Sequence, residues 1–361
     1  MKVVIAVDSF KGSLCSLEAG NAVAEGIKRV NENIETEVCP LADGGEGTVE
    51  ALTWGMGGEM QTITAVNPLG ENIKCQYGIV GKTAIIEIAS TAGLTLLTEQ
   101  KRNPLYTTTY GVGEMIKHAI QKGCRRFIVG IGGSATNDGG IGMLQALGYG
   151  MLDKYGKQVC YGAMGLKELE KITTENVLSE LKECTFYIAC DVNNPLCGEK
   201  GCSAVFAPQK GATKQMVKDM DKWLEKYAIL AKSVSKNADS SVAGTGAAGG
   251  LGFAFLAFTN AVLQSGIDIV LKEIDFESKI KTADIVVTGE GKLDKQTVMG
   301  KAPIGVATLA KKYHKPVIAF AGSVTSESRI CNQYGIDAYF SILHTVTTLE
   351  QAMQKELARQ N

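Results

Sequence analysis

The chain has 361 residues, of which 45% are hydrophobic, and its 37 basic and 38 acidic side chains give a net charge of -1. This length suggests about two domains of ordinary size, and the composition is that of a globular protein rather than a disordered or fibrous one. Lysine and arginine form no block along the chain, which argues against nucleic-acid and membrane-surface partners.

The cysteines and histidines exclude other classes. The ten cysteines are scattered without a CxxC pair. The first predicted strand follows Met1 with no apolar leader, so we expect reduced thiols in a cytoplasmic protein. The three histidines lie far apart in the sequence, which argues against a zinc site. The most apolar run, residues 242–264, contains polar residues and many glycines. We expect a buried loop and helix there rather than a membrane span.

The N-terminal part has the pattern of a parallel α/β domain. A β-branched run ends at Asp8, and a second strand leads into a glycine-rich loop that carries Asp43. The carboxyl ends of parallel strands are where α/β proteins place ligands, so both acids are candidates for a binding edge. The predicted elements are strands over 2–7 and 35–39 and helices over 17–30 and 49–54.

The pattern changes near Ile63. Alternating residues predict an antiparallel hairpin with one solvated face. A helix beginning after a cap at Thr107 or Thr108 follows, and we expect His118 to be a solvated position on it. The predicted elements are strands over 73–79, 83–89, 127–129 and 185–189 and helices over 112–120, 143–147, 166–181 and 214–232.

The last 80 or so residues return to the parallel style, with strands over 284–287, 316–320 and 337–342 and helices over 306–312 and 326–334. Because both ends read as parallel α/β and the middle begins with a hairpin, we predict two domains. The first combines residues 1–62 and 275–361, and the second is inserted over residues 63–274. Two chain crossings would form a hinge with an active-site cleft between the domains.

A glycine-rich stretch over residues 131–142 is central to the functional prediction. It follows a buried strand and precedes a helix, so its backbone and the helix-start N–H groups are expected to face an anion. Ser134, Thr136 and Asn137 add donors, and Asp138 beside them hints at Mg²⁺. The alternative is a tight strand-to-helix turn with an Asp cap. A second glycine stretch, 244–252, suits either phosphate binding or close helix packing.

Two further loops carry acids. Asp191 follows the strand over 185–189, and the loop after residue 287 carries Glu290, Asp294 and three lysines, Lys301 among them. For the loop after residue 287, the alternative is a solvated charged loop without a role in binding. Several strand-end loops therefore combine acids with glycines and hydrogen-bond donors. Together they favour a site that binds phosphates and Mg²⁺, as an enzyme of phosphoryl transfer requires. P-loop, protein-kinase, first-turn GxGxxG and GxSxG motifs are all missing.

Eight motifs then carry a resemblance. They are DSFKGSL (8–14), LADGGEGT (41–48), RNP with TTYG (102–104, 108–111), GGSATNDGG (132–140), DVNNPLCG (191–198), FAPQKGA (206–212), GAAGGLG (246–252) and TGEGKLDKQTVMGKAP (288–303). Through these motifs nearly the whole chain resembles the bacterial glycerate kinases of type 1. It departs from their pattern at Val112 and Asn193, the latter standing where an acid is common.

The resemblance implies ATP- and Mg²⁺-dependent phosphorylation of D-glycerate to 2-phosphoglycerate or 3-phosphoglycerate. It also implies an α/β fold with a Rossmann-like parallel domain made from both termini and an inserted flavodoxin-like α/β domain, in a monomer or homodimer. The alternatives are an ATP-dependent kinase of another small hydroxy acid or polyol, and a non-catalytic sensor of a nucleotide or sugar acid.

Site residues follow as hypotheses. Catalytic roles are assigned to Asp191, Lys11, Asp294 and Lys301, with Asp191 and Asp294 also the candidate Mg²⁺ ligands. The candidate substrate-binding residues are Arg102, Asp8, Asp43, Asn137 and Glu290. The candidate nucleotide-binding residues are Gly132, Gly133, Ser134, Thr136, Gly249 and Gly250. Lys11 or Arg102 would hold the carboxylate of a three-carbon acid or the transferring phosphate, since both groups need a cationic partner.

Overall fold

The computed structural model describes residues 1–10, 12–45, 47–343 and 348–354, and within them the chain divides into two compact units. Unit 1 contains residues 1–43, 47–57 and the chain from 265 onward, and unit 2 contains residues 44–46 and 58–264. The domain boundaries expected at residues 63 and 274 fall inside strand β3 (Glu59–Val66) and one residue after helix α10 (Gly266–Glu273).

Unit 1 is built on a parallel sheet. Within the described residues it has five strands in the order β13-β12-β11-β1-β2, and every neighbouring pair is parallel. The strands are β1 (Lys2–Val7), β2 (Glu35–Val38), β11 (Ile285–Leu293), β12 (Val317–Val324) and β13 (Ala338–Ser341). The prediction that both ends of the chain build one parallel sheet is therefore confirmed.

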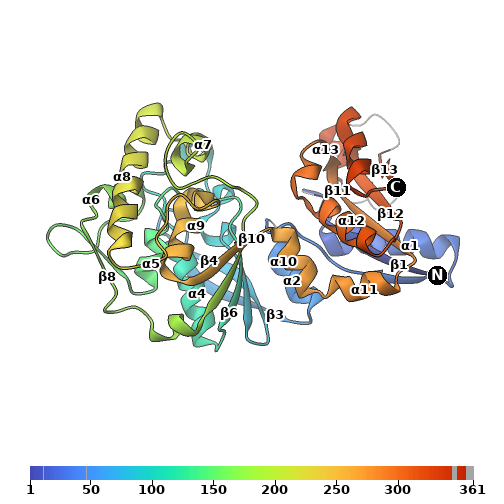
Figure 1. Cartoon of the computed structure of the whole chain (residues 1–361), viewed down its shortest axis with the longest axis horizontal. Helices are drawn as coiled ribbons and strands as arrows, with labels where there is room; N and C mark the ends of the chain where they lie inside the picture. The colour runs from blue at the N-terminus through green and yellow to red at the C-terminus, as the bar shows by residue number, and fades with distance from the viewer. Residues whose placement is uncertain (11, 46, 344–347, 355–361) are drawn as a thin grey trace. The chain divides into compact units, whose positions relative to one another are not determined.

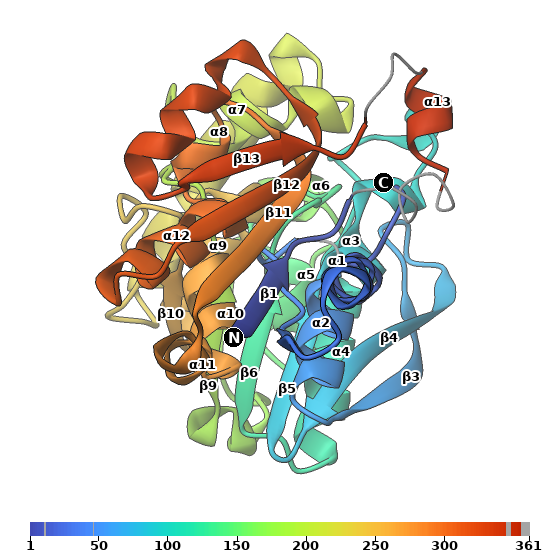
Figure 2. The same ribbon diagram turned by 90° about the vertical axis from the view of Figure 1, so that its right-hand side faces the viewer.

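Helices cover both faces of this sheet. Helix α1 (Ser16–Val30) packs over Val3, Ile5 and Val7, and α12 (Ala302–Lys312) lies on the opposite side of β1 (Figure 2). Burial on both faces explains why β1 reads as a continuous apolar run rather than an alternating one. The other helices of unit 1 are α2 (Thr48–Gly55), α10, α11 (Phe276–Thr282) and α13 (Leu349–Ala352).

Unit 2 is built on a mixed sheet. In the part of the chain that the structure describes, this sheet has six strands in the order β10-β9-β6-β5-β4-β3. The first four run parallel to one another, while β5, β4 and β3 are antiparallel neighbours, so the predicted hairpin is confirmed. The strands after β3 are β4 (Asn72–Val80), β5 (Thr83–Glu87), β6 (Arg126–Gly130), β9 (Thr185–Ala189) and β10 (Asn260–Gln264); β7 (Gly150–Leu152) and β8 (Lys171–Thr173) form a separate antiparallel pair.

The main helices of unit 2 gather on one side of its sheet. Figure 1 shows α4, α5, α8 and α9 on the same side of the strands. The core on that side includes Phe127 and Phe186 from adjacent strands, whose rings stack with centroids 4.6 Å apart. The helices of unit 2 are α3 (Ala89–Ala92), α4 (Tyr110–Gln121), α5 (Ile141–Ala146), α6 (Ala163–Glu168), α7 (Cys202–Phe206), α8 (Lys214–Lys232) and α9 (Ala247–Phe258).

Some predictions of secondary structure are wrong. The helix expected over 166–181 is instead the end of α6, strand β8 and a short 3₁₀ segment, Ser179–Glu183. The β-branched run Ile172–Thr174 favours the strand over the Lys/Glu-rich helical pattern. The helix predicted over Ser326–Tyr334 is present with these bounds and is of the 3₁₀ type. Strands β3 and β10 were not predicted.

The start of α4 agrees with the predicted cap at Thr108: the Thr108 hydroxyl accepts a hydrogen bond from the Tyr110 N–H at 3.1 Å, while Thr109 occupies the N-cap position. The prediction that His118 is a solvated position is wrong. His118 is half-buried, and its Nδ1 atom lies 2.8 Å from the Tyr77 hydroxyl. Burial lowers the pKa of His118.

No described cysteine forms a disulfide. Most are buried or half-buried, while Cys15 in unit 1 and Cys160 in unit 2 are exposed. Among the described residues there is also no helix with the length and apolar character needed to cross a bilayer.

Two glycines inside helices provide a test of the packing. A methyl group on Gly113 of α4 would lie 2.4 Å from the Met143 carbonyl oxygen of α5, whereas Gly26 of α1 has no atom within 4 Å of that position. We expect Gly113→Ala to lower the free energy of unfolding by about 1–3 kcal/mol, because α4 and α5 must move apart. The control Gly26→Ala should raise it by about 0.5–1 kcal/mol through helix propensity. Urea unfolding followed by circular dichroism would measure both, and equal stabilities would contradict this packing.

Candidate functional site

The loop after β6 divides into an exposed and a buried part. Gly132 and Gly133 are exposed, whereas Ser134 to Gly140 are buried. The loop is held beside residues 92–94: the Leu94 N–H donates to the Gly133 carbonyl at 2.8 Å, and the Ala135 N–H donates to the Ala92 carbonyl at 2.8 Å. The two exposed glycines therefore lie at the carboxyl end of a parallel strand, on a backbone that is fixed from one side.

A buried lysine holds the same loop from inside the protein. The Nζ of Lys210, which is 2% exposed, donates to Ser134 Oγ at 2.7 Å and to the Thr136 carbonyl at 2.6 Å. Burial lowers the pKa of Lys210 to about 8, and the nearby Cys202 and Asp138 act against that shift. Sequence reasoning assigned no role to Lys210, although it lies in the FAPQKGA motif.

Asp138 is buried at the start of α5 and has a structural role. Its Oδ2 accepts hydrogen bonds from the Thr109 N–H and hydroxyl, both at 2.9 Å, and its Oδ1 accepts one from the Gly140 N–H at 3.0 Å. Burial raises the pKa of Asp138, and these hydrogen bonds oppose the shift. The Met143 N–H donates to the Thr109 hydroxyl at 3.0 Å.

The start of α5 is therefore closed by protein groups. The expectations that its N–H groups face an anion and that Asp138 points to Mg²⁺ are wrong. The alternative of an Asp cap in a tight turn describes the local structure, because the free N–H groups of a buried helix start need internal acceptors.

The second glycine stretch packs against this loop. Gly249 has φ +67°, and a methyl group there would lie 2.1 Å from the Thr136 carbonyl oxygen. The Gly139 N–H donates to the Gly249 carbonyl at 2.9 Å, and Gly250 lies against Gly139. Only a residue without a side chain allows the two backbones to come this close. Close packing thus accounts for both glycines.

Thr136 and Asn137 are also buried rather than presented to solvent. The Asn137 Nδ2 donates to Ser203 Oγ at 2.9 Å. Among the described residues, Thr136 Oγ1 and Asn137 Oδ1 have no hydrogen-bond partner. Buried polar atoms without partners are uncommon and often mark functional regions.

Arg102 and Asp191 lie near the same loop. The Arg102 carbonyl oxygen is 2.2 Å from where a side chain on Gly211 would begin, so the Arg102 backbone packs against Gly211, the residue after Lys210. Its guanidinium is 3.9 Å from Glu99, and its Nε is buried without a hydrogen-bond partner among the described residues. Asp191 is exposed two residues after β9, whose neighbour in the sheet is β6.

Unit 1 gathers a second group of candidates along β11. Glu290 is buried, accepts a hydrogen bond from Thr297 Oγ1 at 2.6 Å and lies 3.3 Å from Lys301 Nζ. Burial raises the pKa of Glu290, although Thr297 and Lys301 oppose that shift. The strand continues through Glu290 to Leu293, so the predicted loop after residue 287 is in part a strand.

Unit 1 contains three other candidate acids, Asp294, Asp8 and Asp43. Asp294 contacts Lys292 at 3.1 Å, and its pKa is lowered because that contact and the Gln296 N–H outweigh the effect of burial. Asp8 is buried at the end of β1, and its N–H donates to the Gly289 carbonyl at 2.9 Å. Asp43, five residues after β2, is half-buried. Lys11 lies outside the described residues.

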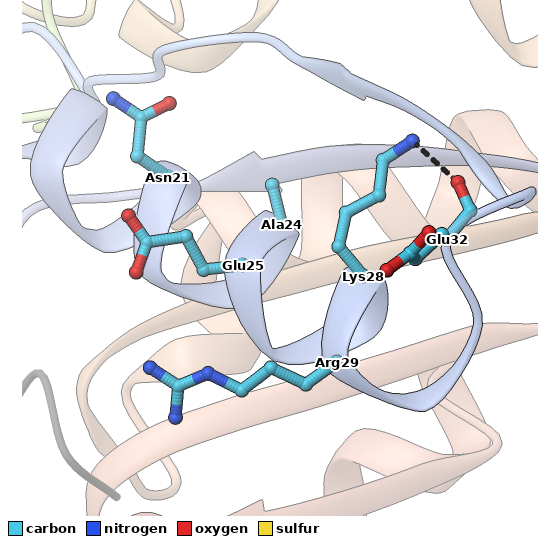
Figure 3. Close-up of a pocket in the computed structure, with 6 residues that line it drawn as sticks. All are labelled: Asn21, Ala24, Glu25, Lys28, Arg29 and Glu32. Carbon is cyan, nitrogen blue, oxygen red and sulfur yellow. Dashed lines mark hydrogen bonds between the residues drawn. The ribbon is translucent and has the colours of Figure 1, made fainter.

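Two hollows of unit 1 are lined by residues other than these acids and lysines. A polar hollow of about 550 Å³ lies on the outer face of α1 (Figure 3), where Lys28 Nζ donates to the Glu32 carbonyl at 3.2 Å. An apolar cavity of about 410 Å³ lies between α1 and the sheet. None of the predicted site residues that the structure describes lines either of them.

The acids of the described chain do not cluster densely. No group of three or more His, Cys, Asp or Glu side chains in that part of the chain could hold a metal ion. The single exposed carboxylate of Asp191 is a donor of the kind that Mg²⁺ uses, because proteins commonly bind this ion through one or two carboxylates while substrate phosphates supply further oxygens.

Comparison with known proteins gives consistent matches. The model of the "Glycerate kinase family" matches residues 3–360. A glycerate kinase of Bacillus subtilis strain 168 is 47% identical over 356 residues, which are 98% of this chain and 93% of the relative. A glycerate 2-kinase of Escherichia coli K12 is 45% identical over 356 residues, with the same coverage. The "Crystal structure of putative glycerate kinase 2 from Salmonella typhimurium LT2" superposes with a TM-score of 0.91 at 44% identity, covering 99% of this chain and 94% of the other.

The cap at Asp138 gives a prediction about stability. Thr109→Val keeps the side-chain shape and removes the hydroxyl that bonds both Asp138 and the Met143 N–H. We expect a loss of about 2–4 kcal/mol, because two buried polar groups lose a partner. The control Thr109→Ser keeps the hydroxyl and removes one methyl group, for which we expect a loss of about 1 kcal/mol. Urea unfolding would measure both variants, and a less stable Ser variant would refute the role of the hydroxyl.

Proposed function

The chain belongs to the glycerate kinase family, and from this premise we propose that it transfers the γ-phosphoryl group of ATP to D-glycerate. Family membership makes it a glycerate kinase, a transferase that uses ATP. For the product we propose 2-phosphoglycerate, since the Escherichia coli relative is named a glycerate 2-kinase, with 3-phosphoglycerate as the alternative. The alternative functions to be tested are a kinase of another small hydroxy acid and a non-catalytic sensor.

The observation that carries the proposal is the exposed Gly132–Gly133 backbone at the carboxyl end of β6. Parallel α/β sheets bind ligands at this edge, and glycines let phosphate oxygens approach backbone N–H groups. Asp191 emerges from the neighbouring strand at the same edge. We assign Gly132, Gly133 and Ser134 to direct contact with nucleotide phosphates. Thr136, Gly249 and Gly250 would support that contact by fixing the loop.

The remaining roles are proposals of the same kind. Arg102 is proposed to bind the glycerate carboxylate, because a guanidinium matches a carboxylate in two hydrogen bonds and its Nε lacks a protein partner among the described residues. Lys11 and Lys301 would steady the transferring phosphate. Asn137, Asp8, Asp43 and Glu290 stay as candidate substrate contacts, although Asn137 and Glu290 are buried.

Mg²⁺ would be held by Asp191 or Asp294, and the other acid would accept the proton of the attacking hydroxyl. The bound ion would neutralise charge on the phosphates during transfer.

These assignments place reacting residues in both units. We accordingly propose that the two units are domains and that both contribute residues to the reaction. The Rossmann-like and flavodoxin-like topologies, the cytoplasmic location and the monomeric or homodimeric state complete the proposal.

The direct test is an assay of the purified protein with ATP, Mg²⁺ and D-glycerate. We expect ADP release in a coupled assay, no release with L-glycerate or glycerol, and a phosphorus resonance of 2-phosphoglycerate in NMR. A 3-phosphoglycerate resonance would correct the position of transfer. Turnover with another acid alone would correct the substrate, and nucleotide binding with no turnover on any acceptor would favour the sensor.

The two candidate acids can be separated by their response to Mg²⁺. Removing a metal ligand, by Asp191→Asn or Asp294→Asn, should raise the Mg²⁺ concentration needed for half-maximal rate by about tenfold or more. Removing the base should instead lower kcat by about 10²–10⁴ at every Mg²⁺ concentration. Steady-state rates over a series of Mg²⁺ concentrations would show which variant has lost the metal ligand and which has lost the base. Asp219→Asn is the control, because this α8 carboxylate accepts a hydrogen bond from Gln215 on the surface of the helix and has no proposed role. A variant with wild-type kcat and Mg²⁺ dependence would remove that acid from both roles.

A further inference from the structure

Lys210 is buried without an acidic partner. Its two hydrogen bonds go to neutral oxygens, those of the Ser134 hydroxyl and the Thr136 carbonyl. It forms no ion pair with any described residue. Asp138 is close enough to influence it, but the Asp138 oxygens are already bonded to Thr109 and Gly140.

Burying an ammonium group in this way is costly unless an anion compensates it. Proteins usually avoid the cost with a carboxylate in contact or an apolar residue instead. An uncompensated lysine at a candidate site is therefore expected where the compensating charge arrives with the ligand.

The contacts of Lys210 lead towards the exposed part of the loop. Ser134 is the residue next to Gly133, and the Gly133 carbonyl is bonded to the Leu94 N–H. Because the Ser134 hydroxyl oxygen accepts a hydrogen bond from Lys210 Nζ, the hydroxyl proton of Ser134 is free to point to another acceptor. Lys210 thus fixes both the backbone at Thr136 and the direction in which Ser134 can donate.

We propose that Lys210 is a positioning residue that acts through Ser134, and that its counter-ion is the phosphate chain of a nucleotide bound at Gly132–Ser134. The inference rests on the proposed function, of which it specifies the nucleotide site. Lys210 itself need not touch the nucleotide, since its charge and its two hydrogen bonds organise the donors that do.

A proton-linked effect follows from the position of Lys210. Its pKa is lowered to about 8 in the unliganded protein, and an anion bound nearby raises it. Below about pH 8 the lysine is already charged, so nucleotide binding takes up no proton there. Above that pH the protein takes up a proton on binding, and the affinity falls as the pH rises. The titratable groups that face Lys210 are Asp138, before α5, and Cys202, on α7, whose pKa burial raises to about 12.

Calorimetric titration of ADP without metal tests the proposal. Binding heats measured in two buffers of different ionisation enthalpy give the protons taken up, at about pH 7 and about pH 9. We expect the wild type to take up close to one proton at the higher pH and almost none at the lower. Lys210→Gln should take up none at either pH and bind ADP about tenfold or more weakly at about pH 7. The control Lys222→Gln, on the exposed side of α8, should match the wild type.

Several outcomes would overturn the inference. One is a folded Lys210→Gln variant with wild-type ADP affinity and proton uptake. Another is proton uptake that accompanies D-glycerate rather than ADP. If Lys210→Gln does not fold, the measurement on the wild-type protein still tests the proposal. ADP binding to the wild type without proton uptake near pH 9 would contradict it. A wild type that binds ADP but does not phosphorylate D-glycerate would refute the proposed function, while the binding data would still decide the role of Lys210.

Discussion

The burial of the segment from Ser134 to Gly140 is the constraint on which the architecture of unit 2 depends. This segment leaves the carboxyl end of β6 and passes through the protein interior before α5 begins. Its polar groups cannot reach water, so other segments must satisfy them. Residues 92–94, Thr109, Lys210 and Gly249 come from four separate parts of the chain and supply those contacts. The fold of unit 2 thereby fixes the exposed glycines that precede the buried segment.

The same segment explains two kinds of glycine in one stretch of sequence. Gly132 and Gly133 are exposed and leave their backbone open to a ligand, whereas Gly139 and Gly140 are buried against Leu224 and Ala254. Unit 1 stabilises a buried charge differently. The buried Glu290 carboxylate accepts a hydrogen bond from the Thr297 hydroxyl and pairs with the Lys301 ammonium group. Unit 2 surrounds a buried cation with neutral oxygens, and unit 1 surrounds a buried acid with donors.

Much of the fold could be predicted because its central strands are apolar runs and its helices carry apolar residues at helical spacing along one face. Strand β1 and helix α8 were predicted with the bounds that the structure gives. Strand β3 was missed because its exposed positions, such as Glu59 and Thr64, interrupt the apolar signal of an edge strand. The composition of residues 166–181 suggested a helix, but local β-branched residues decided otherwise.

The site was harder to predict for a physical reason. A glycine that contacts a phosphate and a glycine that contacts another backbone both need to lack a side chain, so Gly133 and Gly249 look alike in sequence. Lys210 stands between Gln209 and Gly211 and reads as a surface lysine, since this short segment has no hydrophobic periodicity that would indicate a buried position. Its motif was recognisable, but its role requires the contact with Ser134, which lies 76 residues away in the chain.

The distribution of the cysteines makes the chain suitable for spectroscopy. Thiol reagents attack the thiolate, so the buried cysteines, Cys39, Cys75 and Cys184 among them, are poor targets because burial raises their pKa values to about 11. Cys15 and Cys160 are exposed and belong to different units. A donor and an acceptor fluorophore attached to these two natural thiols would report the separation of the units during turnover without any engineered residue.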